Sequence, residues 1–364
     1  MNIDVCRQLD IKYPIFAFSH CRDVVAAVSK TGGMGVLGVS RHSAEELAID
    51  LKWIVEQTGG KPFGVDLIFP AKALSREDAV DEALPEEHRA FVAALIDQFD
   101  VPPPTDGESA RLYSAHMLTS EHFTELAHVA LEFPEVKFLV SALGAPPTEV
   151  ADRARAQGVK LGALVGSPRH ATRQIEAGMD ILIAQGHEAG GHIGNISSMV
   201  LTPQIVDIAE GRPVLTAGGI GDGRQMAAAF ALGAQGVWLG SVWLATVEGE
   251  LPPKLLKRVL GATSEGTLVS RAYSGKSVRL LRTPWFDAWE GEDAPKPLPT
   301  PLQGMLVRDA MTSAVEHQVD AVLTTPIGQI VGMMNKQETC AGVVSRLVEQ
   351  FIEATGNLID ILED

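Results

Sequence analysis

The stretch that decides the fold begins Asp180-Ile-Leu-Ile-Ala-Gln-Gly-His-Glu-Ala-Gly-Gly-His-Ile-Gly194. It continues through Pro213-Val-Leu-Thr-Ala-Gly-Gly-Ile-Gly-Asp-Gly223 and ends with Gly236-Val-Trp-Leu-Gly-Ser241. Each part is a short apolar run followed by glycines. A buried parallel strand reads as a continuous apolar run, and glycine lets the backbone approach a ligand closely. The stretch therefore predicts parallel strands whose carboxyl ends carry a ligand site.

Similar apolar runs recur along the whole chain and alternate with helical patterns. Alternation of strand and helix predicts a parallel sheet, and eight repeats favour a (β/α)8 barrel, with a doubly wound open sheet as the alternative. The eight expected strands span 14–18, 34–38, 63–68, 137–141, 159–164, 180–184, 213–217 and 236–239.

Two segments do not fit the regular spacing of strands and helices. Residues 70–135 separate the third and fourth strands, and residues 249–329 follow the eighth. We therefore expect a barrel formed by 1–248 and 330–364, with 70–135 as an insertion and 249–329 as a smaller lid-like subdomain. Loops at the carboxyl ends of barrel strands line the active site, so both insertions are candidate pocket walls.

Composition restricts the classes of protein to which the chain can belong. The chain has 364 residues, 46% of them hydrophobic, and a formal net charge of −16, which argues against a nucleic-acid binder. Its three cysteines, Cys6, Cys21 and Cys340, are too few for a disulfide framework or a cysteine-based zinc site. The amino terminus lacks a signal-peptide pattern, and no apolar run is long enough to cross a bilayer. We expect a cytoplasmic protein that binds neither nucleic acid nor membrane.

Two glycine turns suggest a phosphate site. Gly218-Gly219 and Gly240-Ser241 follow the seventh and eighth expected strands, where barrels most often bind phosphate. Backbone amides in such turns are natural anion ligands. Turn glycines without a ligand are the plainer alternative.

His187 and His192 bracket Glu188-Ala-Gly-Gly191. A zinc protease helix needs its second histidine four positions after the first, whereas here the spacing is five and two glycines would break the helix, so we expect no metal. A histidine after a glycine turn is a candidate general base, because imidazole titrates near neutrality. The alternative is a histidine hydrogen-bonded to its own loop.

Three motifs together resemble the nitronate monooxygenase family. They are Gln185-Gly-His-Glu-Ala-Gly-Gly-His192, Thr216-Ala-Gly-Gly-Ile-Gly-Asp-Gly223 and Gly233-Ala-Gln-Gly-Val-Trp-Leu-Gly-Ser241. The resemblance extends through 26–38, 62–67 and 326–332, whereas 70–135 and 250–325 match weakly. It implies a (β/α)8 barrel that binds FMN without a covalent bond.

The resemblance also implies roles for individual residues. His192 matches the family's active-site histidine, which orients the substrate or removes its α-proton. The flavin and its phosphate would be held by Ala17, Phe18, Asp66, Gln185, Gly190, Gly191, Gly218, Gly219, Trp238, Leu239, Gly240 and Ser241.

The reaction that this resemblance implies is oxidation of alkyl nitronates by O2 through a flavin semiquinone. The same motifs occur in NAD(P)H-dependent FMN reductases that act on an enoyl thioester or a quinone, and this is the alternative. An aldolase-like phosphate-binding barrel without redox turnover is a third hypothesis. A homodimer is a candidate for the assembly of this protein.

The chain departs from the family pattern at the first and third strands. The family usually has asparagine where this chain has Asp66, and an ionised carboxylate cannot donate a hydrogen bond. An ionised Asp66 would disfavour reduced anionic flavin and an anionic nitronate. Alternatively, Asp66 is protonated by burial or paired with a cation such as Lys160 or Arg22. His20 and Cys21 replace the usual residues after the first strand, and we expect them to pack at a helix start rather than to reach the pocket.

Overall fold

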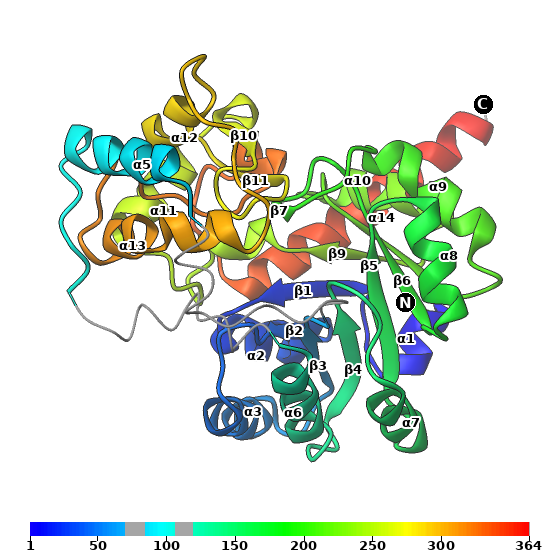
Figure 1. The fold of residues 1–364 in the computed structure, drawn as a ribbon. Coiled ribbons are helices and arrows are strands. Elements are labelled where there is room, and N and C mark those ends of the chain that lie inside the picture. Colours follow the sequence, from blue (N-terminus) through cyan, green and yellow to red (C-terminus); the bar gives the residue numbers. More distant parts are fainter. Residues whose placement is uncertain (70–83, 106–118, 364) are drawn as a thin grey trace.

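A computed structural model describes residues 1–69, 84–105 and 119–363 of the chain. Eight parallel strands form a closed barrel in the order β1-β2-β3-β4-β5-β6-β8-β9, and β9 pairs with β1 (Figure 1). The (β/α)8 barrel expected from the sequence is confirmed. Its strands are β1 (Ile15–Ser19), β2 (Met34–Gly38), β3 (Phe63–Leu67), β4 (Val136–Ser141), β5 (Lys160–Val165), β6 (Ile181–Gln185), β8 (Val214–Ala217) and β9 (Gly236–Leu239).

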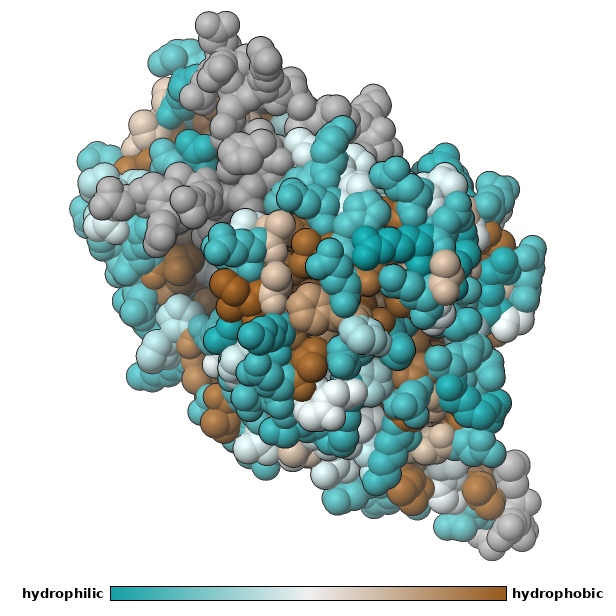
Figure 2. All heavy atoms as spheres, turned by 90° about the horizontal axis from the view of Figure 1, so that it is seen from below, coloured by the Kyte–Doolittle hydropathy of each residue, from teal (hydrophilic) through white to brown (hydrophobic). Residues whose placement is uncertain are grey.

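Helices surround the barrel because each strand also turns apolar side chains outward. Leu37 of β2 and Val65 of β3, for example, belong to a buried cluster that includes helix residues such as Leu126. The covering helices are α2 (Arg22–Thr31), α3 (Ala44–Thr58), α6 (Ser120–Ala130), α7 (Thr148–Ala156), α8 (Pro168–Glu176), α9 (Ser198–Ile208), α10 (Gly223–Ala231) and α14 (Cys340–Glu363). Hydrophilic side chains cover most of the face shown in Figure 2, with apolar ones between them.

The barrel interior is filled by apolar side chains, and a short helix packs against them. Phe16, Phe138 and Leu215 share one buried cluster with Val5 and Leu9 of α1 (Asp4–Leu9). Because α1 immediately precedes β1, it covers the amino ends of the strands. The carboxyl ends are therefore the end at which a ligand can enter.

The second insertion forms a compact unit of its own next to the barrel (Figure 1). It contains α11 (Pro253–Leu260), β10 (Thr267–Ser270), β11 (Val278–Leu281), α12 (Pro284–Trp289) and α13 (Leu302–Glu316). Strand β11 pairs with both β10 and β7 (Gly191–His192), and β7 belongs to the loop after β6. The insertion is thus hydrogen-bonded to the segment that carries the candidate histidine.

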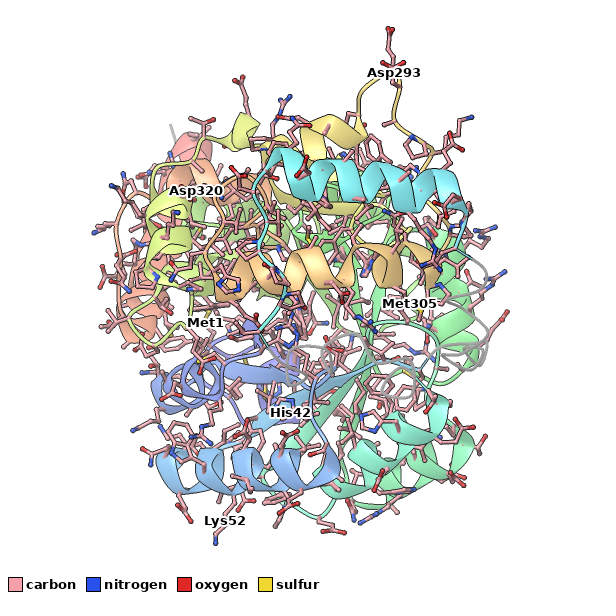
Figure 3. All side chains as sticks on the ribbon, turned by 60° about the vertical axis from the view of Figure 1, so that its left-hand side comes forward. Met1, His42, Lys52, Asp293, Met305 and Asp320 are labelled. Carbon is pink, nitrogen blue, oxygen red and sulfur yellow. The ribbon has the colours of Figure 1, made fainter. Side chains whose placement is uncertain are left out.

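Helix α5 (Glu86–Gln98) belongs to the first insertion but packs on the second. Val92 and Leu95 share a buried cluster with Trp285, Phe286 and Val307. Figure 3 shows α5 beside α13, on the opposite side of the molecule from α3, which carries Lys52. The two insertions therefore build one hydrophobic core; residues 70–83 and 106–118 lie outside the described part of the chain.

Candidate active site

The carboxyl ends of the strands bring several of the predicted site residues together. Side chains alternate across a strand, so Phe18 follows the interior residue Phe16, and its ring lies 6.0 Å from that of Trp238 with an interplanar angle of 24°. By the same alternation Asp66 and Gln185 face the interior. Ala17 and Leu239 instead pack outward with the helices, so only their backbone groups remain near the barrel mouth.

Asp66 carries a buried carboxyl group at the end of β3. Its side chain is 6% exposed, and Oδ1 has no hydrogen-bond partner. Burial alone raises its pKa well above the usual value, because the charged form would lose its hydration. Neither cation considered for it reaches it: Arg22 is paired with Asp50 at 2.7 Å, and Lys160 lies two positions nearer the amino end of its strand than Gly162, which is level with Asp66. Burial therefore favours the protonated form of Asp66, and its Oδ1 is an unused polar atom.

The glycine turn after β9 leaves more room beside its backbone than the turn after β8. A Cβ atom on Gly240 would meet nothing nearer than Phe18 Cδ1 at 3.9 Å, and one on Gly219 would meet Ser198 Oγ at 3.5 Å. Gly218 and Gly219 both have positive φ, at 87° and 75°, which favours glycine. Ser241 Oγ accepts a hydrogen bond from Gly328 N at 2.8 Å, so its own hydroxyl proton remains available to a ligand.

The loop after β6 packs closely on residues 326–329. A Cβ atom on Gly190 would lie 2.7 Å from the backbone of Ile327, so a larger residue would push the two segments apart. Gln329 N donates to the carbonyl oxygen of Glu188 at 3.0 Å. Gly191 has a φ of 80° with open space around it.

His192 lies on β7 with its side chain exposed. Its Nε2 is 2.8 Å from Ser274 Oγ, which belongs to the second insertion. Although part of the residue is in contact with solvent, the protein around the ring removes enough water to lower the pKa of His192 from 6.5, and the positive charge of Lys276 adds a smaller effect. The imidazole is therefore neutral at physiological pH and able to accept a proton.

His187 fills a structural role. Its Nδ1 donates to the carbonyl oxygen of Gly194 at 2.9 Å, so this histidine is bonded to its own loop. Arg279, which is 4% exposed, donates from Nε and Nη2 to the carbonyl oxygen of His187 at 3.2 and 3.1 Å. Its Nη1 donates to Thr267 Oγ1 at 3.0 Å. Arg279 thereby ties the loop after β6 to β10 and β11.

His20 and Cys21 both have structural partners. Nδ1 of His20 donates to the carbonyl oxygen of Gly38 at 2.7 Å, and its ring meets that of Phe18 edge to face. Removal of water, with a smaller effect of the charge of Arg41, lowers the pKa of His20 to about 4.

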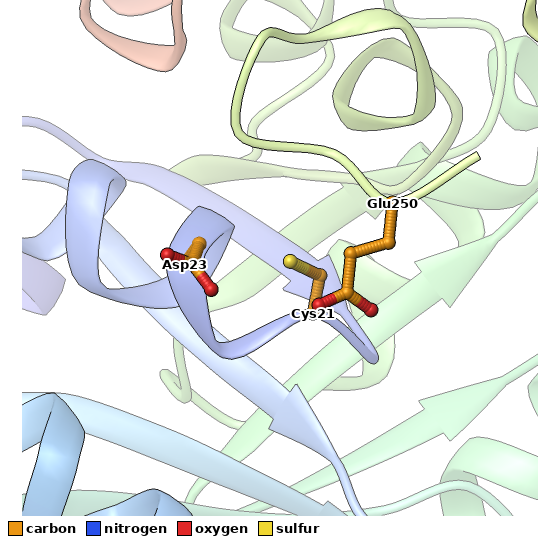
Figure 4. Close-up of side chains that lie close together, drawn as sticks. All are labelled: Cys21, Asp23 and Glu250. Carbon is orange, nitrogen blue, oxygen red and sulfur yellow. The ribbon is translucent and has the colours of Figure 1, made fainter. Parts of the chain in front are cut away.

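Cys21 is the residue before α2, and its thiol donates to the carbonyl oxygen of Glu248 at 3.1 Å. Burial raises its pKa to about 11, so the thiol is protonated. Cys21, Asp23 and Glu250 lie close together (Figure 4), but a protonated thiol is a poor metal ligand, and we assign no metal to this group.

Comparison with known proteins identifies the family. The sequence profile of the nitronate monooxygenase family matches residues 6–350. This chain belongs to the nitronate monooxygenase family. It is 42% identical over its whole length, and over the whole of its relative, to Rv1533 of Mycobacterium tuberculosis, a protein provisionally named as a monooxygenase.

Two solved structures share the fold over nearly the whole chain. Nitroalkane oxidase from Streptomyces ansochromogenes has a TM-score of 0.79 and 25% identity, covering 97% of this chain and 99% of its own. FabK from Thermotoga maritima has a TM-score of 0.76 and 26% identity, covering 99% of each chain. The protein is thus an oxidoreductase of a flavin-dependent family. Among the described helices, none is both long and apolar enough to span a bilayer.

Two observations at the mouth of the barrel fit the binding of FMN. The free Oδ1 of the neutral Asp66 can exchange hydrogen bonds with a polar ring edge. Gly240 has room beside its backbone, as a phosphate cradle requires.

Sequence reasoning missed Ser274, Arg279 and Gly328. The first two lie in the segment that matches the family weakly, and their role depends on the pairing of β11 with β7, for which no local pattern exists. Gly328 lies in the Pro326–Gly332 segment that the resemblance does include, so closer attention to that segment could have found it.

Proposed function

We propose that this protein is an FMN-dependent nitronate monooxygenase that oxidises alkyl nitronates with O2. The observation that carries the proposal is a neutral, exposed imidazole, His192, held next to the cationic Lys276 at the open end of the barrel. A positive charge there attracts an anionic nitronate. A neutral imidazole can hydrogen-bond that anion or remove the α-proton of a neutral nitroalkane.

The other residues of the site would hold the cofactor and adjust its surroundings. Gly219, Gly240 and Ser241 would bind the phosphate, while Phe18 and Asp66 would lie against the ring. Because burial raises the pKa of Asp66, it favours the form that adds no negative charge to repel an anionic substrate. When bound, FMN supplies the electron transfer and the reaction with O2.

An NAD(P)H-dependent FMN reductase of an enoyl thioester or quinone is the second candidate. The chain is as similar to FabK as it is to nitroalkane oxidase, at 26% and 25% identity. Anaerobic flavin spectra during separate titrations with propyl-2-nitronate, NADH and NADPH would distinguish the two. Bleaching by nitronate and not by either nicotinamide is expected; rapid bleaching by NADH or NADPH alone would favour the reductase.

His192→Asn tests the histidine itself. The variant is expected to bind FMN normally and to lose about 100-fold or more in turnover, the usual contribution of an acid–base group. Turnover equal to that of the parent protein would remove His192 from the mechanism.

A further inference from the structure

We propose that Ser274 is a positioning residue that accepts a hydrogen bond from Nε2–H of His192 and so leaves the Nδ1 lone pair for the substrate. The inference rests on the proposed function, in which His192 handles a proton. The two ring nitrogens of a neutral histidine differ, because one carries the proton and the other accepts. Whichever group holds one nitrogen therefore decides what the other can do.

The contact between the two residues is built by sheet pairing. Ser274 lies in the hairpin between β10 and β11, and the register of β11 with β7 places Val278 opposite His192. Ile193 N donates to the carbonyl oxygen of Ser277 at 3.1 Å, so the backbones of the two segments are joined on both sides of the histidine. The hairpin thus brings Ser274 Oγ within 2.8 Å of Nε2.

The hairpin itself is held in one conformation. Arg271 and Gly275 exchange hydrogen bonds: Gly275 N donates to Arg271 O at 2.8 Å, and Arg271 Nε donates to Gly275 O at 3.0 Å. Gly275 has a φ of 84°, and a Cβ atom there would lie 2.4 Å from Thr300 N. The Thr300 hydroxyl also donates to the carbonyl oxygen of Ser274. These bonds fix the backbone of the hairpin and so keep Ser274 Oγ beside Nε2 of His192.

The proton balance of the step follows from this arrangement. With a neutral nitroalkane, the α C–H bond breaks, its proton goes to Nδ1 of His192, and the electron pair stays on the substrate as the nitronate. The resulting imidazolium carries a proton on both nitrogens. Ser274 then accepts a charge-assisted hydrogen bond, which is stronger than the neutral one, from Nε2–H. Serine therefore stabilises the charged product of proton transfer, in which Nε2 must carry a proton.

The test compares Ser274→Ala with Ser274→Thr, which keeps the hydroxyl group, and with the control Ser277→Ala on the same hairpin. All are studied as FMN-loaded protein. In protein labelled with 15N-histidine, nitrogen chemical shifts report which nitrogen of His192 is protonated, without any turnover. We expect the parent and Ser274→Thr to carry the proton on Nε2, and Ser274→Ala to show a mixture of tautomers.

Kinetics gives the second readout. With a neutral nitroalkane, Ser274→Ala is expected to lower kcat about tenfold with little change in KM, while Ser274→Thr and Ser277→Ala stay near the parent value. Loss of an acceptor destabilises the imidazolium, so the acidic limb of the kcat/KM profile should stay in place or move to lower pH.

Three results would overturn the inference: a proton on Nδ1 in the parent protein, an upward shift of the acidic limb in Ser274→Ala, or unchanged kinetics in that variant. If His192→Asn is inactive while Ser274→Ala is unaffected, only the role of Ser274 fails. If His192→Asn is fully active, His192 leaves the mechanism and the role of Ser274 fails with it, whereas the flavin titrations test the proposed function separately.

Discussion

Asp66 shows how one side chain can make stability depend on pH. Its carboxyl is buried with one oxygen unpaired, and its pKa is raised in the folded protein. The folded state thus holds a proton that the unfolded chain releases above about pH 4. Above that pH the unfolded state binds fewer protons than the folded state, so stability falls as pH rises toward the folded pKa.

Asp66→Asn is therefore expected to be more stable than the parent protein, by an amount that grows with pH. The slope of the difference is at most about 1.4 kcal/mol per pH unit between the two pKa values. Urea unfolding at pH 5, 6, 7 and 8 measures it. A stability difference that is the same at every pH would mean that Asp66 is ionised in the folded state.

A substitution at Gly240 tests whether the turn after β9 binds the phosphate of FMN. Its φ of −119° is open to any residue, and a new Cβ atom would have no close neighbour, so Gly240→Ala should fold normally. The methyl group would occupy the space facing the barrel mouth. We expect FMN affinity to fall about tenfold or more, measured by fluorescence titration of the apoprotein.

Gly304→Ala is the control for that variant. Gly304 lies in α13 with no atom within 4 Å of its would-be Cβ atom, so alanine there should leave FMN affinity unchanged. Equal FMN affinity in Gly240→Ala and Gly304→Ala would place the phosphate elsewhere.

At the scale of elements, β11 connects the second insertion to the loop after β6, which carries His192. Arg279 on this strand makes the connection by donating three hydrogen bonds across it. Arg279→Met leaves the partly buried carbonyl of His187 without this partner, which costs about 1–3 kcal/mol. We expect lower stability together with lower turnover, because the loop that carries His192 loses its support.

Arg282→Met provides the matched comparison. Arg282 follows β11, is 56% exposed and pairs with Asp287 on the surface. Its replacement should change the free energy of unfolding by less than about 1 kcal/mol. If Arg279→Met and Arg282→Met unfold at the same urea concentration, the buried network does not stabilise the fold.

At the scale of the whole molecule, segments that are far apart in the sequence share one core beside the barrel. Leu95 of α5 is 3% exposed within the cluster formed mainly by residues 272–322. Leu95→Ala should cost about 2–5 kcal/mol, as is usual for a buried leucine.

Hydrogen exchange would show how far that loss spreads. Protection should fall in both 86–98 and 267–322, with less change in the barrel strands, while the exposed Gln98→Ala leaves both regions unchanged. Loss of protection confined to 86–98 would show that α5 is only an attachment to the surface.

The sequence by itself determined the barrel and one half of the candidate site. Buried parallel strands must be apolar and glycine turns must follow them, so all eight strands and the turns at Gly218 and Gly240 leave a local pattern. The raised pKa of Asp66 follows from its burial, which depends on the tertiary structure.

The tertiary structure alone decided the other half of the site. Ser274 contacts His192 across a sequence separation of 82 residues, and α5 meets α13 only in space. Such contacts depend on antiparallel pairing and side-chain packing between distant segments, and periodicity within either segment carries no information about its partner. A local pattern reports which face of an element is buried, whereas only the folded chain determines what that face contacts.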